Sequence, residues 1–345
     1  MWKYTLKRIL LAFCTAFIIL SLTFILLKLL KFQKPSGTLP AQFGYYLQQV
    51  NLGFVYDFIL PTEGYGELLF SYKDSAGLTH NFYQVPILTQ YFNWLRNIIT
   101  RWDWGTSIYI SQNMPATSII AEKLPVSISI NVISTLFAVP TGIILGIIAA
   151  LKKNKPTDNI ISTCVMIFIS IPSFVLITLL MLLLCYKLKW LPTQWPQPTD
   201  PLSFKVLGYI LPVLALSFGS IAGYARFTRA ELCEVMSSEY LLLARTKGLT
   251  KRQAIIRHAL RNAMVPIIPS ILAEVIAILG GSMILENLYG IPGIGGLFVE
   301  SLNAKDYNIL FVDMAIFTTI GLVSGVFLDI SYGFIDPRIR MGAKK

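Results

Sequence analysis

The sequence predicts an all-α membrane protein with six transmembrane helices and a small α+β segment after the first of them. The chain of 345 residues is 54% hydrophobic and only 14% charged. Its mean hydropathy of +0.63 exceeds that of an ordinary soluble domain. Six apolar runs approach or exceed the ~20 residues with which a helix crosses a bilayer. These runs are 9–30, 126–151, 159–186, 206–228, 266–286 and 308–333.

Basic residues follow a regular pattern between these runs. They gather before the first run, after the second, after the fourth and after the sixth, for example at Lys7, Lys152, Arg252 and Arg338. The positive-inside rule then predicts that both termini are cytoplasmic. The net charge of +11 is explained by this topology. It does not indicate a nucleic-acid site, and we expect no nucleic-acid partner.

The apolar runs and the basic segments suggest four parts along the chain. Residues 1–31 form the first transmembrane helix, and 32–115 form an extracytoplasmic segment. Residues 116–336 form the main transmembrane domain, which includes a cytoplasmic loop at 231–265. Residues 337–345 form a cytoplasmic tail.

The chain shows no residue pattern for chemistry of its own. Its four cysteines contain no CxxC pair, which argues against a disulfide framework or a zinc site. It has only two histidines and no GxxxxGK[ST] motif, the phosphate-binding loop of many ATPases. We therefore expect no catalytic residue, no metal ligand and no bound cofactor.

The extracytoplasmic segment contains two local patterns. Residues 66–85, GELLFSYKDSAGLTHNFYQV, alternate in polarity on both sides of DSAG, which predicts a β-hairpin. Residues 88–102 have helical spacing. The predicted apolar face of that helix consists of Tyr91, Trp94, Leu95, Ile98 and Ile99.

The basic block EYLLLARTKGLTKRQAIIRHALRNA, residues 239–263, predicts two short helices. Good helix formers fill 239–247, Gly248 interrupts them, and Thr250 can cap a second helix over 251–262. The fourth span is expected to continue as helix into the cytoplasm before this block. Composition alone leaves two interpretations open, a helix that binds anionic lipid and a compact element that docks on a partner.

The residue order of this block resembles the cytoplasmic coupling loop of ABC-importer permeases in the dipeptide/oligopeptide/nickel transport family. The matching positions include Glu239, Tyr240, Ala244, Arg245, Lys247, Gly248, Leu249, His258, Asn262 and Pro266. Four further stretches resemble the same family in the right order, within 90–107, 170–193, 286–310 and 328–340. The resemblance covers about residues 1–31 and 86–341, and is to the first permease subunit of such importers.

The resemblance implies a fold, a function and partners. The fold is the core of type I ABC importer permeases (MetI-like), in a multi-pass protein of the bacterial cytoplasmic membrane. The function is ATP-driven import of di- or oligopeptides. The partners are a second homologous permease, two cytoplasmic ATP-binding subunits and an extracytoplasmic substrate-binding protein, so that ATP is bound by partner subunits. The residues implied to contact the ATPase are Tyr240, Ala244, Arg245, Lys247, Gly248 and Leu249.

Several positions depart from the family pattern. Residues 35–85 do not resemble the usual first outer segment, and Asn308 stands where proline is common. Glu274 is an acid within a predicted span, and it either lines the translocation pathway or reaches the cytoplasmic edge or a basic partner. Asp313 is expected to be solvated near the end of the sixth span. YGIPGIGG, at 289–296, is expected to form a tight turn or re-entrant element and not a phosphate cradle.

Other functions remain open at this stage. The same machine could carry nickel or another small solute. A membrane receptor is a different class, but no cytoplasmic segment exceeds about 40 residues, which leaves no room for an output domain. An inverted repeat and paired intramembrane charges would favour a secondary transporter, and neither is evident.

Overall fold

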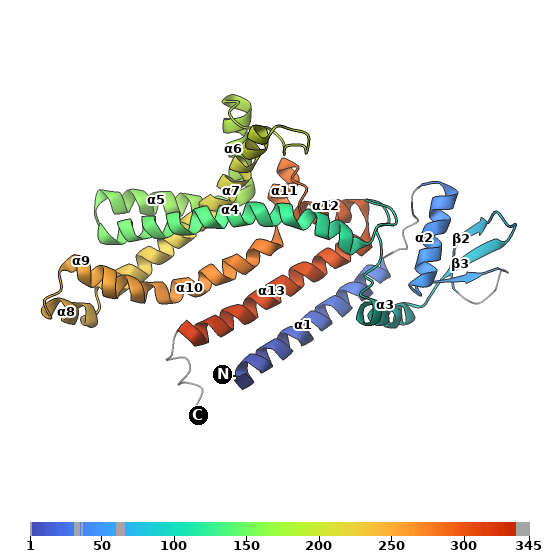
Figure 1. The fold of residues 1–345 in the computed structure, drawn as a ribbon, viewed down its shortest axis with the longest axis horizontal. Helices are drawn as coiled ribbons and strands as arrows, with labels where there is room; N and C mark the ends of the chain where they lie inside the picture. Colours follow the sequence, from blue (N-terminus) through green and yellow to red (C-terminus); the bar gives the residue numbers. More distant parts are fainter. Residues whose placement is uncertain (1, 31–34, 36, 60–65, 336–345) are drawn as a thin grey trace. The chain divides into compact units, whose positions relative to one another are not determined.

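The computed structural model describes residues 2–30, 35, 37–59 and 66–335, and the chain forms two compact units (Figure 1). Unit 1 comprises the described residues of Met1–Leu10, Pro125–Gly296 and Ile320–Lys345. Unit 2 comprises those of Leu11–Leu124 and Leu297–Thr319. Helices α1 (Trp2–Leu29), α4 (Ala116–Leu151), α12 (Ile294–Ala304) and α13 (Tyr307–Ile335) contribute residues to both units.

The predicted membrane-spanning character is confirmed. Within the described ranges, five helices are long and apolar enough to cross a membrane, and a bent helix pair makes up to six. Helices are required because lipid offers no hydrogen-bond partner to an open backbone. The five are Thr5–Leu29, Ala116–Leu151, Leu202–Met236, Lys251–Gly280 and Tyr307–Ser331. The predicted tail, 337–345, lies outside the described residues.

The third predicted span, 159–186, is not one helix. It consists of α5 (Pro156–Ser170), α6 (Ser173–Leu180) and the π-helical turn η1 (Met181–Lys187), with a bend of 103° between the two parts. Pro172 has no N–H to donate, and its ring disfavours the helical conformation in the preceding residue. Ile171 is accordingly extended, with φ −85° and ψ 120°. The expectation of a single third helix is therefore wrong.

The fifth span has different boundaries from those predicted. A helix begins as α9 (Lys251–Ala254) and continues through η2 (Ile255–Ala259), α10 (Leu260–Ala277) and η3 (Ile278–Gly280). The basic segment 251–262 is therefore the first part of this span and not a separate short helix. The span ends at Gly280 and not at 286, because Gly281 adopts φ +61°. A new helix, α11 (Met283–Tyr289), follows.

Helix α7 (Leu202–Met236) is the centre of unit 1, and α5, α6 and α10 pack against it. Two glycines of α4 allow a close approach to the same helix. A Cβ atom at Gly142 would lie 2.7 Å from the Tyr224 Cβ, and one at Gly146 would lie 2.6 Å from the Thr228 Cβ. Small residues at such positions let membrane helices pack closely where no hydrophobic force drives them together.

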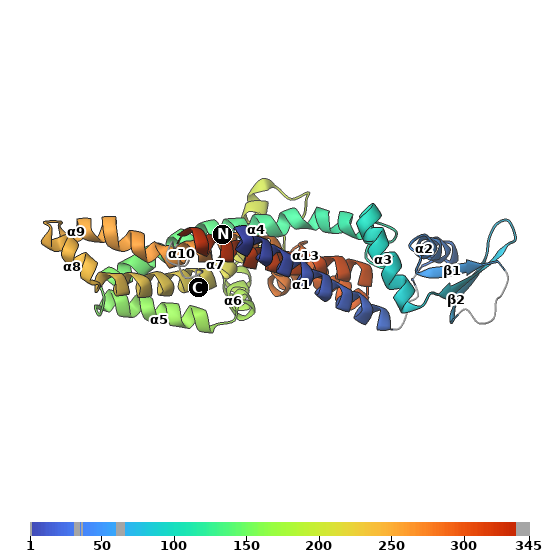
Figure 2. The same ribbon diagram turned by 90° about the horizontal axis from the view of Figure 1, so that it is seen from below.

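Unit 2 contains α2 (Leu39–Asn51), α3 (Ile87–Arg101) and a three-stranded antiparallel sheet in the order β1-β3-β2 (Figure 2). The predicted hairpin is confirmed as β2 (Leu68–Lys73) and β3 (Thr79–Gln84). Strand β1 (Val55–Phe58) and α2 were not predicted from local patterns. The stacked rings of Tyr46, Phe70 and Phe82 join α2 to the sheet.

Helix α3 packs through most of its predicted apolar face. Trp94 stacks on Phe24 of α1 with ring centroids 4.8 Å apart, and the Tyr91 hydroxyl lies 2.9 Å from the Ser21 hydroxyl. Leu95 and Ile98 pack against the same cluster. Ile99 is 73% exposed, so its assignment to the packed face was wrong.

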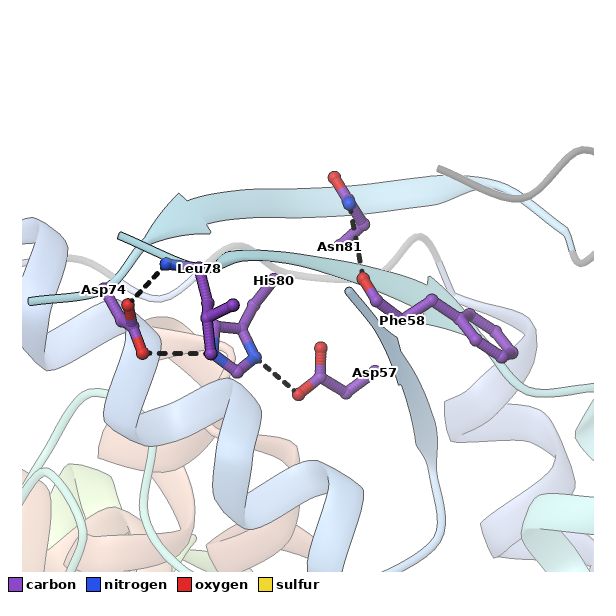
Figure 3. Close-up of polar contacts among 6 residues, drawn as sticks. All are labelled: Asp57, Phe58, Asp74, Leu78, His80 and Asn81. Carbon is purple, nitrogen blue, oxygen red and sulfur yellow. Dashed lines mark hydrogen bonds and ion pairs between the residues drawn. The ribbon is translucent and has the colours of Figure 1, made fainter. Parts of the chain in front are cut away.

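A histidine between two carboxylates joins the three strands (Figure 3). His80 of β3 lies with Nδ1 2.7 Å from Oδ2 of Asp57 in β1, and with Nε2 3.6 Å from Oδ2 of Asp74 in the β2–β3 turn. Asp74 also accepts hydrogen bonds from the backbone N–H groups of Ala76 and Leu78. The hydrogen bond to Asp57 raises the pKa of His80 above its ordinary value of 6.5.

The raised pKa of His80 predicts a pH-dependent sheet. The protonated imidazole stabilises the folded sheet fully below the unfolded-state pKa, and this contribution is lost as the pH rises through the raised folded-state pKa. Hydrogen–deuterium exchange of β1 and β3 in the full chain should therefore show protection that falls as the pH rises above the ordinary pKa of 6.5 and through the raised folded-state pKa.

In His80→Gln the protection of β1 and β3 should no longer change with pH in this way. Comparing the variant with the unmodified chain at each pH cancels the pH dependence of intrinsic exchange. His258→Gln, at the second of the two histidines, is the matched control and should leave the protection of the sheet unchanged. Identical protection profiles for His80→Gln and the unmodified chain would contradict the prediction.

Candidate functional site

The predicted coupling loop is formed by α8 (Glu239–Thr246), a glycine turn and the start of α9, at the tip of unit 1 (Figure 1). Helix α7 continues to Met236, as predicted. Thr250 caps α9 with a complete capping box: its side chain accepts from the Gln253 backbone N–H, and the Gln253 side chain accepts from the Thr250 N–H. The predicted cap at Thr250 is therefore confirmed.

One leucine anchors α8 to the rest of unit 1. Leu241 is 5% exposed and belongs to a cluster with Leu232 of α7 and Ala254 of α9. Leu249, after the glycine turn, packs against the same cluster and is half-buried. Leu249, which is predicted to contact a partner, thus also contributes to the anchor of the loop.

The remaining predicted residues of the loop are accessible. Tyr240 is 41% exposed, and Arg245, Lys247 and Gly248 are exposed, whereas Ala244 is half-buried. Leu242 and Leu243 are 64% and 56% exposed, although the predicted site did not include them. The run of three leucines at 241–243 could have revealed this exposure, because one turn of helix cannot bury all three side chains. Helix α8 thus presents an apolar surface bordered by basic residues.

Gly248 is required by backbone conformation and not by crowding. Its φ is +92°, a value that residues with a side chain rarely adopt, and no atom lies within 4 Å of a Cβ built there. The turn brings Lys251 and Leu242 to the border of one cleft of about 230 Å³ beside α8. The orientation of α8 relative to α9 therefore depends on the torsion angles of this residue.

A buried ion pair stabilises the α4–α5 connection against α7. The Asp158 carboxylate, 1% exposed, accepts hydrogen bonds from the Arg229 guanidinium at 2.6 and 2.8 Å. It also accepts from the Asn154 backbone N–H and the Ser162 hydroxyl. Sequence analysis missed this pair, which lies two turns of helix before the end of α7 that leads into α8.

A second buried carboxylate organises the glycine-rich stretch. Glu286 of α11, 2% exposed, accepts hydrogen bonds from the Ser127 hydroxyl at 2.9 Å and from the backbone N–H groups of Ser282 and Gly296 at 3.1 and 2.9 Å. The Ser127 hydroxyl in turn accepts from the Ile294 N–H. We call these five residues the Glu286 cluster.

Glycine is needed around the Glu286 cluster because the carboxylate occupies the available space. A Cβ atom at Gly293 would collide with both Glu286 and Ser127, and one at Gly295 would lie 2.6 Å from the Met283 nitrogen. The glycine-rich stretch is thus the turn between α11 and α12, as predicted, and the group at its centre is the protein's own carboxylate.

A third buried carboxylate joins two stretches that each resemble the permease family in sequence, 90–107 and 286–310. Asp306 is 0% exposed, and its Oδ2 accepts from the Ser107 hydroxyl at 2.6 Å and from the backbone N–H groups of Ile108, Tyr109 and Ile110. Asn308, which departs from the family's proline, donates to the Thr106 carbonyl at 2.7 Å. The unusual residue therefore has a structural role in unit 2.

Of the two acids singled out within the spans, only Asp313 contradicts the expectation. Glu274 is half-buried and accepts a hydrogen bond from the Ser220 hydroxyl of α7 at 2.9 Å. Asp313 is 0% exposed, so the expectation of a solvated side chain was wrong. It is buried because the start of α13 lies in the interior of unit 2, where Leu310, Phe311 and Val312 are buried as well.

Comparison with known proteins matches residues 142–341 to a family described as the binding-protein-dependent transport system inner membrane component. The dipeptide transport system permease protein DppB of Lactococcus lactis subsp. cremoris is 32% identical over 99% of this chain and 100% of its own length. The oligopeptide transport system permease protein OppB of Haemophilus influenzae is 30% identical, again over 99% and 100%. DppB of Bacillus subtilis is 35% identical over 75% of this chain and 81% of its own.

Loss of the Glu286 carboxylate is predicted to destabilise unit 1. Glu286→Ala leaves the Ser127 hydroxyl and two backbone N–H groups without their acceptor, and each unpaired buried donor costs about 1–3 kcal/mol. We expect a loss of about 3 kcal/mol or more, measured as thermal unfolding of the full chain in lipid nanodiscs.

The unfolding temperature of Glu286→Gln should lie between those of Glu286→Ala and the unmodified chain, because an amide keeps one acceptor oxygen. Glu300→Ala, at an exposed acid of α12, is the control and should leave the unfolding temperature unchanged. Equal unfolding temperatures for Glu286→Ala and Glu300→Ala would show that the cluster contributes nothing.

Proposed function

The chain belongs to the family of binding-protein-dependent inner-membrane transport components, and we propose that it forms one half of the translocation pathway of an ATP-driven importer of di- and oligopeptides. It is a multi-pass permease subunit of the bacterial cytoplasmic membrane. It is a transporter component and not an enzyme, since ATP hydrolysis belongs to separate subunits.

The observation that carries the mechanism is the exposed apolar surface of α8. Tyr240, Leu242 and Leu243 are all more than two-fifths exposed on a helix that Leu241 anchors from the other side. Exposed apolar side chains gathered on one element mark a contact with a partner. We propose that α8 lies in a groove of a cytoplasmic ATP-binding subunit, with Arg245 and Lys247 against its acidic rim.

Movement of α8 can reach the membrane through two helices. Leu241 packs against Leu232 of α7 on one side and against Ala254 of α9 on the other. The helix that starts as α9 continues to Gly280, so a displacement of its first turn is transmitted along its length. Closure of the ATP-binding subunits would in this way tilt α7 and the fifth span together and change access to the pathway.

The proposed assembly follows because this chain forms part of the pathway while other subunits bind and hydrolyse ATP. The other members are a second homologous permease, two ATP-binding subunits and an extracytoplasmic substrate-binding protein. The chain needs no cofactor of its own, because ATP is bound by the partners. In this proposal both termini and α8 lie in the cytoplasm, and the segment 32–115 lies on the opposite side, in agreement with the basic residues near α8.

Peptide cargo is supported by the relatives, whose names specify dipeptide and oligopeptide transport. Within this proposal Glu274 contributes to the pathway. Its carboxylate lies against α7, held by Ser220, and could meet the amino terminus of a passing peptide. Nickel or another small solute is the alternative cargo, and a cargo without an amino group would not need this acid.

A charge on the exposed surface of α8 should uncouple the importer. Leu243→Asp places a carboxylate where the proposed contact is apolar, and burying an unpaired charge is strongly unfavourable. We expect co-purification of the ATP-binding subunits and peptide uptake to fall at least tenfold. Leu243→Met, which keeps the apolar character, should retain both, and full co-purification of Leu243→Asp would exclude this surface as the contact.

The backbone of Gly248 provides a separate test of coupling. Gly248→Val should abolish uptake because a β-branched residue is strained at positive φ, while membrane insertion is retained. Gly248→Asn should retain more activity, since asparagine tolerates positive φ better than other residues with a side chain. Uptake assays with normal transport by Gly248→Val would refute the role of the turn.

A further inference from the structure

A cavity in unit 2 lies at the C-terminal end of α1 and contains donors without acceptors. Its volume is about 60 Å³, and its walls include Phe24 and Lys28 of α1, Gln49 of α2 and Trp94 of α3. By volume it holds roughly four water molecules, or one group the size of a phosphate.

The positive charge in this cavity lies against two aromatic rings. The Lys28 ammonium nitrogen lies 4.3 Å from the ring centroid of Phe54 and 5.6 Å from that of Phe24. No carboxylate of the described chain lies within 4 Å of it. Aromatic faces attract a cation but accept none of its three N–H donors in the way that an anion does.

Three of the residues that line the same cavity carry further donors. The Gln49 Nε2, Trp94 Nε1 and Trp104 Nε1 atoms are buried and have no hydrogen-bond partner within the described structure. Gln49 and Trp94 are only 2% and 6% exposed. Buried donors without acceptors are costly, so the site favours a ligand that supplies several acceptor oxygens.

One acid also borders the cavity, and one of its two oxygens already accepts a hydrogen bond. Asp103 is exposed, and its Oδ1 accepts a hydrogen bond from the Gly105 backbone N–H at 3.0 Å. The buried part of the cavity therefore keeps an excess of donors and a positive charge. Water could satisfy the donors, but it could not neutralise Lys28.

The surroundings favour a ligand with hydrocarbon chains. Leu22, Leu26 and Leu29 of α1 are 56%, 63% and 64% exposed, and α1 has the length and composition of a membrane span that ends at Leu29. On α3, which packs on α1, Leu88 and Phe92 are 69% and 64% exposed. Lysine and tryptophan at the end of a span are typical of the membrane–water interface.

We propose that this cavity binds the phosphate group of a phospholipid. The phosphate oxygens accept from Lys28 and from the Gln49, Trp94 and Trp104 donors, and the acyl chains run along the exposed leucines of α1. The bound lipid ties the end of the first span to α2 and α3, which hold the sheet of unit 2.

The test is phospholipid binding to the full-length chain, counted by native mass spectrometry. Delipidated protein in detergent is titrated with short-chain phosphatidylglycerol, with diacylglycerol of the same chain length, and with inorganic phosphate. We expect one tightly held phosphatidylglycerol per chain, and binding at least tenfold weaker for diacylglycerol and for inorganic phosphate.

Variants separate the proposed contacts from general lipid adhesion. Lys28→Met, which keeps the length of the side chain, should weaken phosphatidylglycerol binding about tenfold. Trp104→Phe, which keeps an aromatic ring and removes the N–H, should weaken it several-fold. Lys187→Met, at an exposed lysine ending η1, is the matched control and should bind as the unmodified chain does.

Three results would overturn the proposal. Equal affinity for diacylglycerol would show that the phosphate is not recognised, and equal affinity for inorganic phosphate would assign the site to a free anion. Unchanged binding by both Lys28→Met and Trp104→Phe would show that phosphatidylglycerol binds elsewhere on the chain.

Discussion

Buried carboxylates hold together the segments that connect the spans. Asp158, Glu286 and Asp306 each accept three or four hydrogen bonds, from partners up to 71, 159 and 199 residues away in the sequence. A carboxylate accepts several donors at once, and its hydrogen bonds are stronger than those of neutral groups. Non-helical backbone in a membrane protein must be satisfied internally. These three acids satisfy it at the connections, where helix geometry cannot.

Helix α8 is held in a different way. Its buried contact is Leu241, assisted by Leu249 after the turn, and no carboxylate clamp within the described residues joins it to the spans. A helix with few anchoring contacts, attached to spans whose connections are rigid, can move and transmit its movement to those spans. In the proposed assembly, α8 can adjust to the ATP-binding subunit, while α7 is stabilised against α5 by Asp158 and Arg229.

Local rules predicted the elements whose signal lies within a few residues. The spans follow from apolar length, the hairpin from alternation around DSAG, and the start of α9 from Thr250 as a cap after Gly248. The same rules failed where a neighbour in space decides. Asp313 was expected to be a solvated acid near the end of a span, yet it is buried in unit 2. The break at Pro172 could have been predicted, because proline restricts the residue before it.

The sequence by itself determined the class of protein, the number of candidate spans and the position of the basic loop that we propose as the coupling loop, because hydropathy, charge asymmetry and residue order are properties of the chain. Only the tertiary structure decided which loop residues face outward, where the fifth helix begins and ends, and which acids are clamps. These depend on contacts between residues far apart in the sequence. The residue type of an acid does not show whether its carboxylate is buried or solvated. Only the donors around Glu286 and Asp306 show that these two carboxylates are buried.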